Sequence, residues 1–217
     1  MKYISFAIPC YNSAAYMDRA VESILKGGED VEIIIVNDGS KDDTSKIAHE
    51  YEEKYPTIIR AVDKENGGKS DALNAGINAS SYPLFACLDA DSRLERDSLL
   101  RLGNEFIKDT TTVVAGGLVR IANGGVIKDG IFESYNLPEK AIERFQTVEY
   151  FRSFLAGRTS WGVTNSMLIV SGAFGVFKKQ VVIDVGGYKT DTIGEDMEIV
   201  VRIHEYMLRN KIKYKVK

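Results

Sequence analysis

Two aspartates, Asp89 and Asp91, stand one residue apart directly after the apolar run Leu84–Leu88 in the stretch YPLFACLDADSRL. A carboxylate beside a buried run is costly unless a partner compensates its charge. Hard carboxylate oxygens favour magnesium or manganese. Because residues i and i+2 of an extended segment point to the same side, the pair predicts a metal site where a strand leaves its sheet.

Apolar, strand-like runs with polar ends recur along the first half of the chain. They alternate with segments whose apolar residues have helical spacing, such as Tyr16 to Leu25. This alternation predicts an α/β fold with a mostly parallel, Rossmann-like sheet flanked by helices. The predicted strands are Tyr3–Ile8, Val31–Val36, Ile58–Val62 and Leu84–Leu88.

In such a sheet, ligands bind at the carboxyl ends of the strands. These ends read IPCYNS, VNDGSKDD, KENGGKSDALNAG and LDADS, and all four are polar. Residues far apart in sequence are therefore expected to converge at one edge. They are Asn12, Asp38, Lys69, Asp89 and Asp91.

The second half of the chain is less regular. It predicts strands at Val113–Val119 and Phe174–Phe177, a long amphipathic helix at Pro138–Leu155 and a helix at Glu195–Arg209. With 217 residues, 44% of them hydrophobic, the chain is expected to form one compact domain.

Composition excludes several classes of protein. A net charge of -3 provides no basic field for nucleic acid, so no nucleic-acid partner is expected. Cys10 and Cys87 lie within apolar runs without metal-ligand spacing, which indicates buried thiols in the reducing cytoplasm. No apolar run reaches the roughly 20 residues that span a bilayer, so the chain as given is expected to be soluble.

Two familiar phosphate-binding motifs are absent. The dinucleotide fingerprint G-x-G-x-x-G would follow the first strand, where the chain reads PCYNSA. The sequence GKS at Gly68–Ser70 matches the end of a phosphate loop, but Asp63 stands where its first glycine is required. The remaining possibility is a nucleotide whose phosphates are bound through a divalent cation. Such a cation is needed because carboxylates and a diphosphate repel each other.

Five motifs, in this order, resemble the inverting glycosyltransferases of family 2, which have the GT-A fold. They are IPCYN, VNDGSKDDT, ENGGKSDALNAG, LDADS and GEDME, and together they span nearly the whole chain. The resemblance implies a metal-dependent hexosyl- or N-acetylhexosaminyl-transferase of polysaccharide biosynthesis. Its donor would be a nucleotide diphosphate sugar, usually UDP-linked, and its acceptor the hydroxyl of a carbohydrate or lipid-linked molecule. A nucleotide-binding half would cover residues 1–92, and an acceptor and catalytic half residues 93–217.

The resemblance also implies a role for each matching position. Pro9, Tyr11 and Asn12 would line the base and ribose pocket, Asp38 would bind the base, and Lys69 would lie near the nucleotide. Asp91 would be the main ligand of Mn²⁺ or Mg²⁺, and Asp89 would contact nucleotide or metal. Asp196 matches the catalytic base, and Glu195 beside it would contact the donor or the acceptor. Gly172 of SGAFGVF would lie beneath the donor sugar.

Structural explanations compete with these roles. Asp38 fits a turn or helix cap, Lys69 is an ordinary first-turn residue, and Asp91 fits a cap. One carboxylate of the GED motif would serve only the helix dipole, and Gly172 fits a tight turn equally well. The aromatic residues Tyr150, Phe151, Phe154 and Trp161 are expected to be core residues.

Alternatives for the whole chain remain open. The segment FRSFLAGRTSWGVTNSMLIVSGAFGVF resembles a membrane-associated branch of the family, although a Q-x-x-R-W motif does not follow GED here. The chain is therefore expected to be a truncated, engineered or chimeric version of a parent that can associate with the membrane. The other functions considered are a catalytically silent nucleotide-sugar binding module and a nucleotidyltransferase, although PCYNSAAY lacks the glycine- and arginine-rich loop of the latter.

Overall fold

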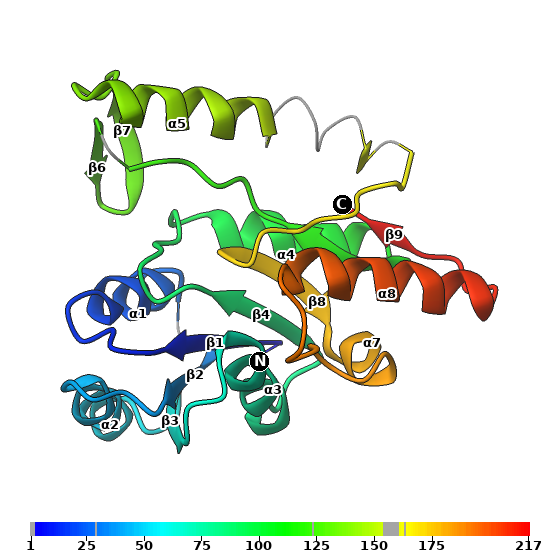
Figure 1. Ribbon diagram of the computed structural model, residues 1–217, viewed down its shortest axis with the longest axis horizontal. Helices are drawn as coiled ribbons and strands as arrows, with labels where there is room; N and C mark the ends of the chain where they lie inside the picture. The colour runs from blue at the N-terminus through cyan, green and yellow to red at the C-terminus, as the bar shows by residue number, and fades with distance from the viewer. Residues whose placement is uncertain (1–2, 29, 123, 154–160, 163) are drawn as a thin grey trace.

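The computed structural model describes residues 3–28, 30–122, 124–153, 161–162 and 164–217. Its centre is a seven-stranded sheet of order β3-β2-β1-β4-β8-β5-β9 (Figure 1). The strands are β1 Ile4–Cys10, β2 Val31–Asp38, β3 Ile59–Lys64, β4 Leu84–Leu88, β5 Thr112–Gly116, β8 Phe174–Lys178 and β9 Lys215–Val216. Strands β1 to β4 are parallel, whereas β8 runs antiparallel between β4 and β5. The predicted mostly parallel sheet is confirmed.

Helices cover both faces of this sheet. On one face pack α1 (Met17–Leu25), α2 (Thr44–Lys54) and α4 (Ser98–Lys108). On the other pack α3 (Lys69–Ala79), α7 (Lys179–Asp184) and α8 (Glu195–Arg209). Every residue of β2 is buried, which explains why its sequence VEIIIVND is an almost unbroken apolar run instead of an alternating one.

Helix α3 approaches the sheet closely because of one glycine. A Cβ at Gly76 would lie 2.6 Å from the Cβ of Ala7 in β1, so the helix can pack this near only without a side chain there. The first residue of α3 is Lys69. The close packing of α3 therefore positions a predicted site residue at the carboxyl edge of the sheet.

One unit stands apart from the central sheet. The hairpin of β6 (Gly125–Lys128) and β7 (Ile131–Tyr135), together with α5 (Ala141–Phe151), lies beyond the sheet at the top of Figure 1. The sequence did not predict the hairpin. The helix expected at Pro138–Leu155 begins at Ala141, and Leu155 lies outside the described residues.

The expected core role of the aromatic residues near α5 is largely wrong. Phe151 and Trp161 are exposed over nearly half of their surface, Tyr150 is half-buried, and Phe154 lies outside the described residues. Tyr150 and Phe151 of α5 share a small cavity with Phe132 of the β6–β7 hairpin and lie outside the central sheet, so helical spacing alone misidentified a core face. Among the helices described, none has the length and apolar character needed to cross a membrane.

We expect Gly76→Ala to destabilise the protein. The new methyl group would overlap Ala7, and the net loss after the gain in helix propensity should be about 1–2 kcal/mol of unfolding free energy. Gly103→Ala is the matched control, because a Cβ there in α4 meets nothing within 4 Å and should stabilise by about 0.5–1 kcal/mol. Urea titrations of both variants measure the difference, and equal stabilities would contradict the packing argument.

Candidate functional site

The loops that follow β1 and β2 are joined by Asn12. Its side-chain Oδ1 accepts the backbone N–H of Lys41 at 2.9 Å, and its own N–H donates to Ser40 Oγ at 3.0 Å. Asn12 adopts a positive φ of 50°, which asparagine tolerates better than most residues. The turn after β1 is thereby fixed against the end of β2.

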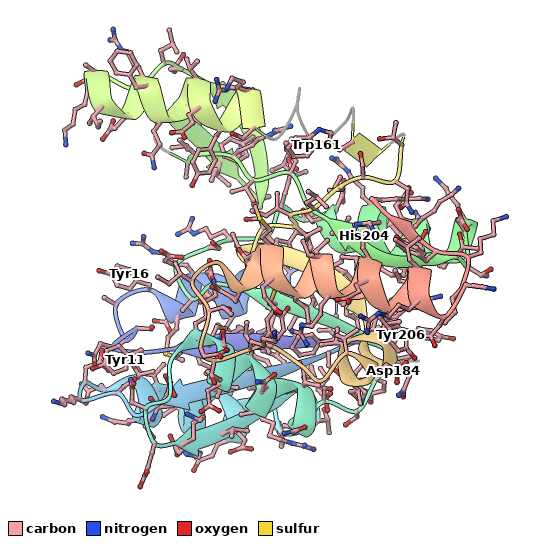
Figure 2. All side chains as sticks on the ribbon, turned by 45° about the vertical axis from the view of Figure 1, so that its right-hand side comes forward. Tyr11, Tyr16, Trp161, Asp184, His204 and Tyr206 are labelled. Atoms are coloured by element: carbon pink, nitrogen blue, oxygen red, sulfur yellow. The ribbon has the colours of Figure 1, made fainter. Side chains whose placement is uncertain are left out.

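The side chain of Tyr11 projects from this turn. It is 52% exposed, and Figure 2 shows it with Tyr16 at the opposite end of the molecule from Asp184 and Tyr206. Pro9, which precedes it in β1, lies beside Val36 of β2. The residues predicted to line a base and ribose pocket thus lie at the carboxyl end of β1, where Tyr11 is exposed.

Asp38 is buried at the end of β2 and binds the backbone of the loop that precedes α3. Its Oδ1 accepts the N–H of Gly67 at 2.9 Å and lies 2.5 Å from Lys64 Nζ, and its Oδ2 accepts the N–H of Gly68 at 2.8 Å. Lys64 also forms an ion pair with Asp71 at 2.6 Å. The carboxylate of Asp38 therefore holds the residues that directly precede Lys69.

Sequence reasoning missed Lys64. The register of β2 and β3, which only the structure gives, places Asp38 directly opposite Lys64. Burial alone would lower the pKa of the Lys64 amine, but the hydrogen bonds to Asp38 and Asp71 raise it. The amine is therefore a permanent counter-charge for the buried aspartate.

The amine of Lys69 lies between carboxylates from two distant elements. Its Nζ is 2.7 Å from Asp89 Oδ1, at the end of β4, and 3.5 Å from Glu195 Oε1, the first residue of α8. Burial alone would lower the pKa of Lys69, but the neighbouring Asp89 and Asp196 carboxylates raise it. Lys69 thus carries a persistent positive charge that links three elements of the fold.

Asp196 follows Glu195 in the first turn of α8, and its Oδ2 accepts the backbone N–H of Gly172 at 2.7 Å. The pKa of the Asp196 carboxyl is raised, mainly because the group is buried. The positive charge of Lys69 and the Gly172 hydrogen bond lower this pKa, whereas the negative charges of Glu195 and Asp89 raise it further. An aspartate with a raised pKa is a stronger base than an ordinary one.

Asp91 differs from its neighbour Asp89. The chain turns directly after β4, and Ser92 N–H donates to Asp89 O at 2.9 Å, so the extended geometry expected for these residues is wrong. Asp89 meets Lys69, whereas Asp91 is exposed and lines a cavity. The two carboxylates therefore have separate surroundings.

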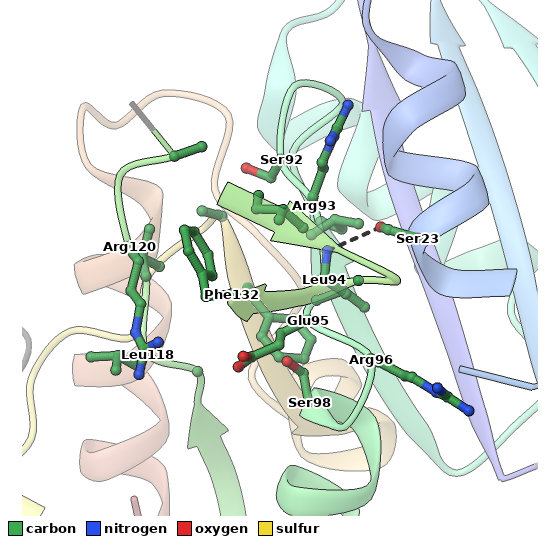
Figure 3. Close-up of a pocket in the computed structure, with 18 of the residues that line it drawn as sticks. Ser23, Ser92, Arg93, Leu94, Glu95, Arg96, Ser98, Leu118, Arg120 and Phe132 are labelled. Atoms are coloured by element: carbon green, nitrogen blue, oxygen red, sulfur yellow. Dashed lines mark hydrogen bonds between the residues drawn. The ribbon is translucent and has the colours of Figure 1, made fainter. Parts of the chain in front are cut away.

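This cavity of about 820 Å³ lies between α1, the loop after β4, the stretch after β5 and the β6–β7 hairpin. Figure 3 shows Arg93 and Arg96 on either side of Leu94, whose N–H donates to Ser23 Oγ of α1 at 3.0 Å. The guanidinium of Arg120 lies 5.9 Å from the ring centroid of Phe132. Guanidinium, hydroxyl and carboxylate groups around one hollow provide donors and acceptors for a polyhydroxylated ligand.

The donor set fits a divalent cation that is shared with phosphates. Among the residues that the structure describes, no three His, Cys, Asp or Glu side chains are grouped to form a metal cage. Magnesium is commonly bound by one or two carboxylates together with substrate phosphates, which needs no such cage. Asp91 offers one accessible carboxylate, and Asp89 offers a second that is paired with Lys69.

The predicted site residues thus form two groups along one edge, and Asp91 stands apart from both in the cavity. In the first group Lys69 forms ion pairs with Asp89 and Glu195, and Gly172 donates a hydrogen bond to Asp196. The charges of Lys69 and Asp196 act on each other through space. Pro9, Tyr11, Asn12 and Asp38 lie at the ends of the neighbouring strands β1 and β2. A further pair that the sequence did not reveal is Asn74 and Tyr188, whose two hydrogen bonds of 2.7 and 2.8 Å hold α3 to the chain before α8.

Comparison with known proteins adds sequence relatives. Residues 5–179 match the family model described as Glycosyl transferase family 2. The poly-beta-1,6-N-acetyl-D-glucosamine synthase of Staphylococcus epidermidis is 32% identical over 213 residues, and that of Staphylococcus aureus strain COL is 33% identical. Each alignment covers 97% of this chain and 47% of the synthase, so the chain spans about half the length of these curated relatives.

Solved structures share the GT-A fold. A mannosyltransferase from Pyrobaculum calidifontis, solved with GDP-Man and Mn²⁺, aligns with a TM-score of 0.70 at 18% identity, covering 99% of this chain and 54% of that one. Residues 1–349 of S. aureus TarS in complex with UDP align with a TM-score of 0.63 at 18% identity, covering 94% and 55%. At these identities the likeness confirms the predicted fold.

The raised pKa of Asp196 generates a stability prediction. The folded state holds this proton more tightly than the unfolded state, so stability from the carboxyl is present at low pH and is lost as pH rises through the raised pKa. Asp196→Asn removes the charge and should gain roughly 0.5–2 kcal/mol over the wild type above that pKa. Thermal melts from pH 4 to 8 measure the gain.

Asp191→Asn is the matched control for this experiment, because Asp191 is an exposed aspartate of the loop that precedes α8. Its stability should follow that of the wild type across the pH range. An Asp196→Asn variant that is less stable than the wild type at pH 8 would contradict the predicted sign.

Proposed function

Because the chain belongs to glycosyl transferase family 2, we propose that it transfers a sugar from a nucleotide diphosphate donor to an acceptor hydroxyl, with inversion at the anomeric carbon. The observation that carries the proposal is the convergence of Asp89 and Asp196 about Lys69, although these residues are far apart in sequence. An ion pair that only stabilises the fold needs a single carboxylate, so several carboxylates around one amine at the edge of the sheet favour a functional site.

The nucleotide lies at the ends of β1 and β2 in this proposal. Tyr11 is exposed beside Pro9 and Asn12 and provides a face for the base and ribose. Asp38 is buried, with its two oxygens engaged by Lys64, Gly67 and Gly68. We therefore propose that Asp38 holds the loop beside the nucleotide in place, in addition to its predicted contact with the base.

Asp91 would hold Mn²⁺ or Mg²⁺ through its accessible carboxylate, and Asp89, which is paired with Lys69, would be the second carboxylate available to the cation. When bound, the cation stabilises the negative charge on the departing diphosphate as a Lewis acid. Lys69 supplies a second positive charge at the same edge, 2.7 Å from Asp89. Preorganised charges of this kind contribute most where water is excluded.

Asp196 acts as the general base. It takes the proton of the acceptor hydroxyl while the acceptor oxygen bonds to the anomeric carbon on the face opposite the leaving group. The bond from that carbon to the diphosphate breaks, and its electron pair leaves with the diphosphate. The position of Asp196 in the first turn of α8 supports this role, since the helix dipole favours the ionised carboxylate that accepts the proton.

The relatives supply the substrate class. Two are named as synthases of an N-acetyl-D-glucosamine polymer, and TarS has been solved with UDP and with UDP-GlcNAc. We therefore propose a UDP-linked N-acetylhexosamine as donor and the end of a growing polysaccharide or a lipid-linked sugar as acceptor. The cavity beside Asp91 is of a size that holds a sugar chain.

The reaction is proposed to occur in the cytoplasm, at the membrane face if a longer parent is anchored there. Cys10 and Cys87 are buried free thiols, as expected in a reducing compartment.

We expect UDP to bind in a manganese-dependent manner. Calorimetric titration should show binding with Mn²⁺ that EDTA abolishes, and Asp91→Asn should weaken it by at least tenfold because the accessible carboxylate is lost. Asp97→Asn is the control: it removes a carboxylate just after the loop that follows β4, and this variant should bind UDP as the wild type does. Failure of the wild type to bind UDP in either condition would contradict the proposed donor.

The role of Asp196 is tested by transfer activity. Asp196→Asn should leave UDP affinity within about twofold of the wild type and lower kcat by roughly 10²–10⁴-fold, because the proton acceptor is lost. Release of UDP from UDP-GlcNAc in the presence of chitooligosaccharide acceptors measures kcat. Equal loss of affinity in Asp91→Asn and Asp196→Asn would refute the division of roles, and binding without transfer in the wild type would identify a silent binding module.

A further inference from the structure

Gly172 lies at the centre of the candidate site. It precedes β8 by two residues and is buried between the Asp196 carboxylate of α8 and the Lys69 amine of α3. The sequence pattern suggested that a small residue here admits the donor sugar. The surrounding atoms indicate that the space left by the glycine is instead occupied by the protein's own catalytic groups.

The backbone N–H of Gly172 fixes one of the two carboxylate oxygens. It donates to Asp196 Oδ2 at 2.7 Å, which is a short, charge-assisted hydrogen bond. Asp196 Oδ1 receives no hydrogen bond from any residue that the structure describes. The two oxygens are therefore inequivalent, and Oδ1 is the one left to accept a proton.

The missing side chain of Gly172 is equally important. A Cβ at this position would lie 2.7 Å from Asp196 Oδ2, closer still to Oδ1, and 2.8 Å from Lys69 Nζ. Real Cβ atoms do not approach other atoms this closely, so either Asp196 or Lys69 would have to move. Any residue larger than glycine is therefore incompatible with the observed placement of the carboxylate.

The groups on the other sides of Asp196 cannot easily move. The ion pairs of Lys69 with Asp89 and Glu195 hold the amine opposite the glycine. Asn74 binds the backbone N–H and carbonyl of Tyr188 and so ties α3 to the segment that leads into α8. Because these contacts hold the Lys69 amine and the segment that leads into α8, we expect the carboxylate to be the group that yields to an added methyl group.

We propose that Gly172 is a positioning residue for Asp196: its N–H binds Oδ2, and its lack of a side chain keeps Oδ1 directed at the acceptor hydroxyl. This inference rests on the proposed role of Asp196 as the base. It assigns the glycine to the orientation of the base, in place of the contact with the donor sugar expected from the sequence.

The test is Gly172→Ala. The methyl group should rotate the carboxylate away from its observed position, and a misplacement of about 1 Å can cost roughly 10²-fold in rate. We expect kcat to fall by about 10–100-fold, with the KM for UDP-GlcNAc and the manganese-dependent affinity for UDP within about twofold of the wild type. Gly103→Ala, whose Cβ meets nothing within 4 Å, should have wild-type kcat.

A double-mutant cycle with Asp196→Ala tests the contact without activity. In the wild-type background, Gly172→Ala should lower the melting temperature. In the Asp196→Ala background, where the opposing carboxylate is absent, the same change should lower the melting temperature less. This readout remains valid if Gly172→Ala is too unstable for kinetics. It also remains valid if the wild type transfers no sugar, which would refute the proposed function but not the contact.

Two results would overturn the proposal. The first is a wild-type kcat in Gly172→Ala, because the carboxylate would then not depend on the glycine. The second is a parallel loss of kcat and UDP affinity with additive melting temperatures, because the glycine would then have a general structural role.

Discussion

The charge of Lys69 is the feature on which the rest of the site depends. Asp89, Glu195 and Asp196 converge from β4 and α8, and like charges at such range would repel one another without a cation among them. The amine lies 2.7 and 3.5 Å from two of these carboxylates and acts on the third through space. It therefore joins α3, the end of β4 and the start of α8 into one functional unit.

The scaffold places this amine through a chain of close contacts. Helix α3 begins at Lys69, and the loop before it is held by the buried carboxylate of Asp38 through Gly67 and Gly68. Further along α3, Gly76 allows close packing on β1. The nucleotide end and the catalytic end of the proposed site are thus coupled, because both depend on the position of one helix and its preceding loop.

How far the sequence predicted the structure depended on how local the signal was. Strand β4 and helix α8 have the predicted bounds Leu84–Leu88 and Glu195–Arg209, because apolar runs and helical periodicity are local signals. The β6–β7 hairpin was missed, and Phe151 proved exposed, because this unit packs outside the central sheet. An amphipathic pattern shows that a helix has an apolar face but does not show what covers it.

The sequence by itself determined the chemical groups available and the strand ends at which they stand: carboxylates after β4, a lysine at the start of α3 and an acidic first turn in α8. The tertiary structure alone decided their pairing. Asp89 faces Lys69 while Asp91 faces a cavity, and Gly172 donates to Asp196 across 24 residues of chain. The physical reason is that ion pairs and close backbone contacts act over a few ångströms, and such distances between remote residues are set by the packing of helices on the sheet.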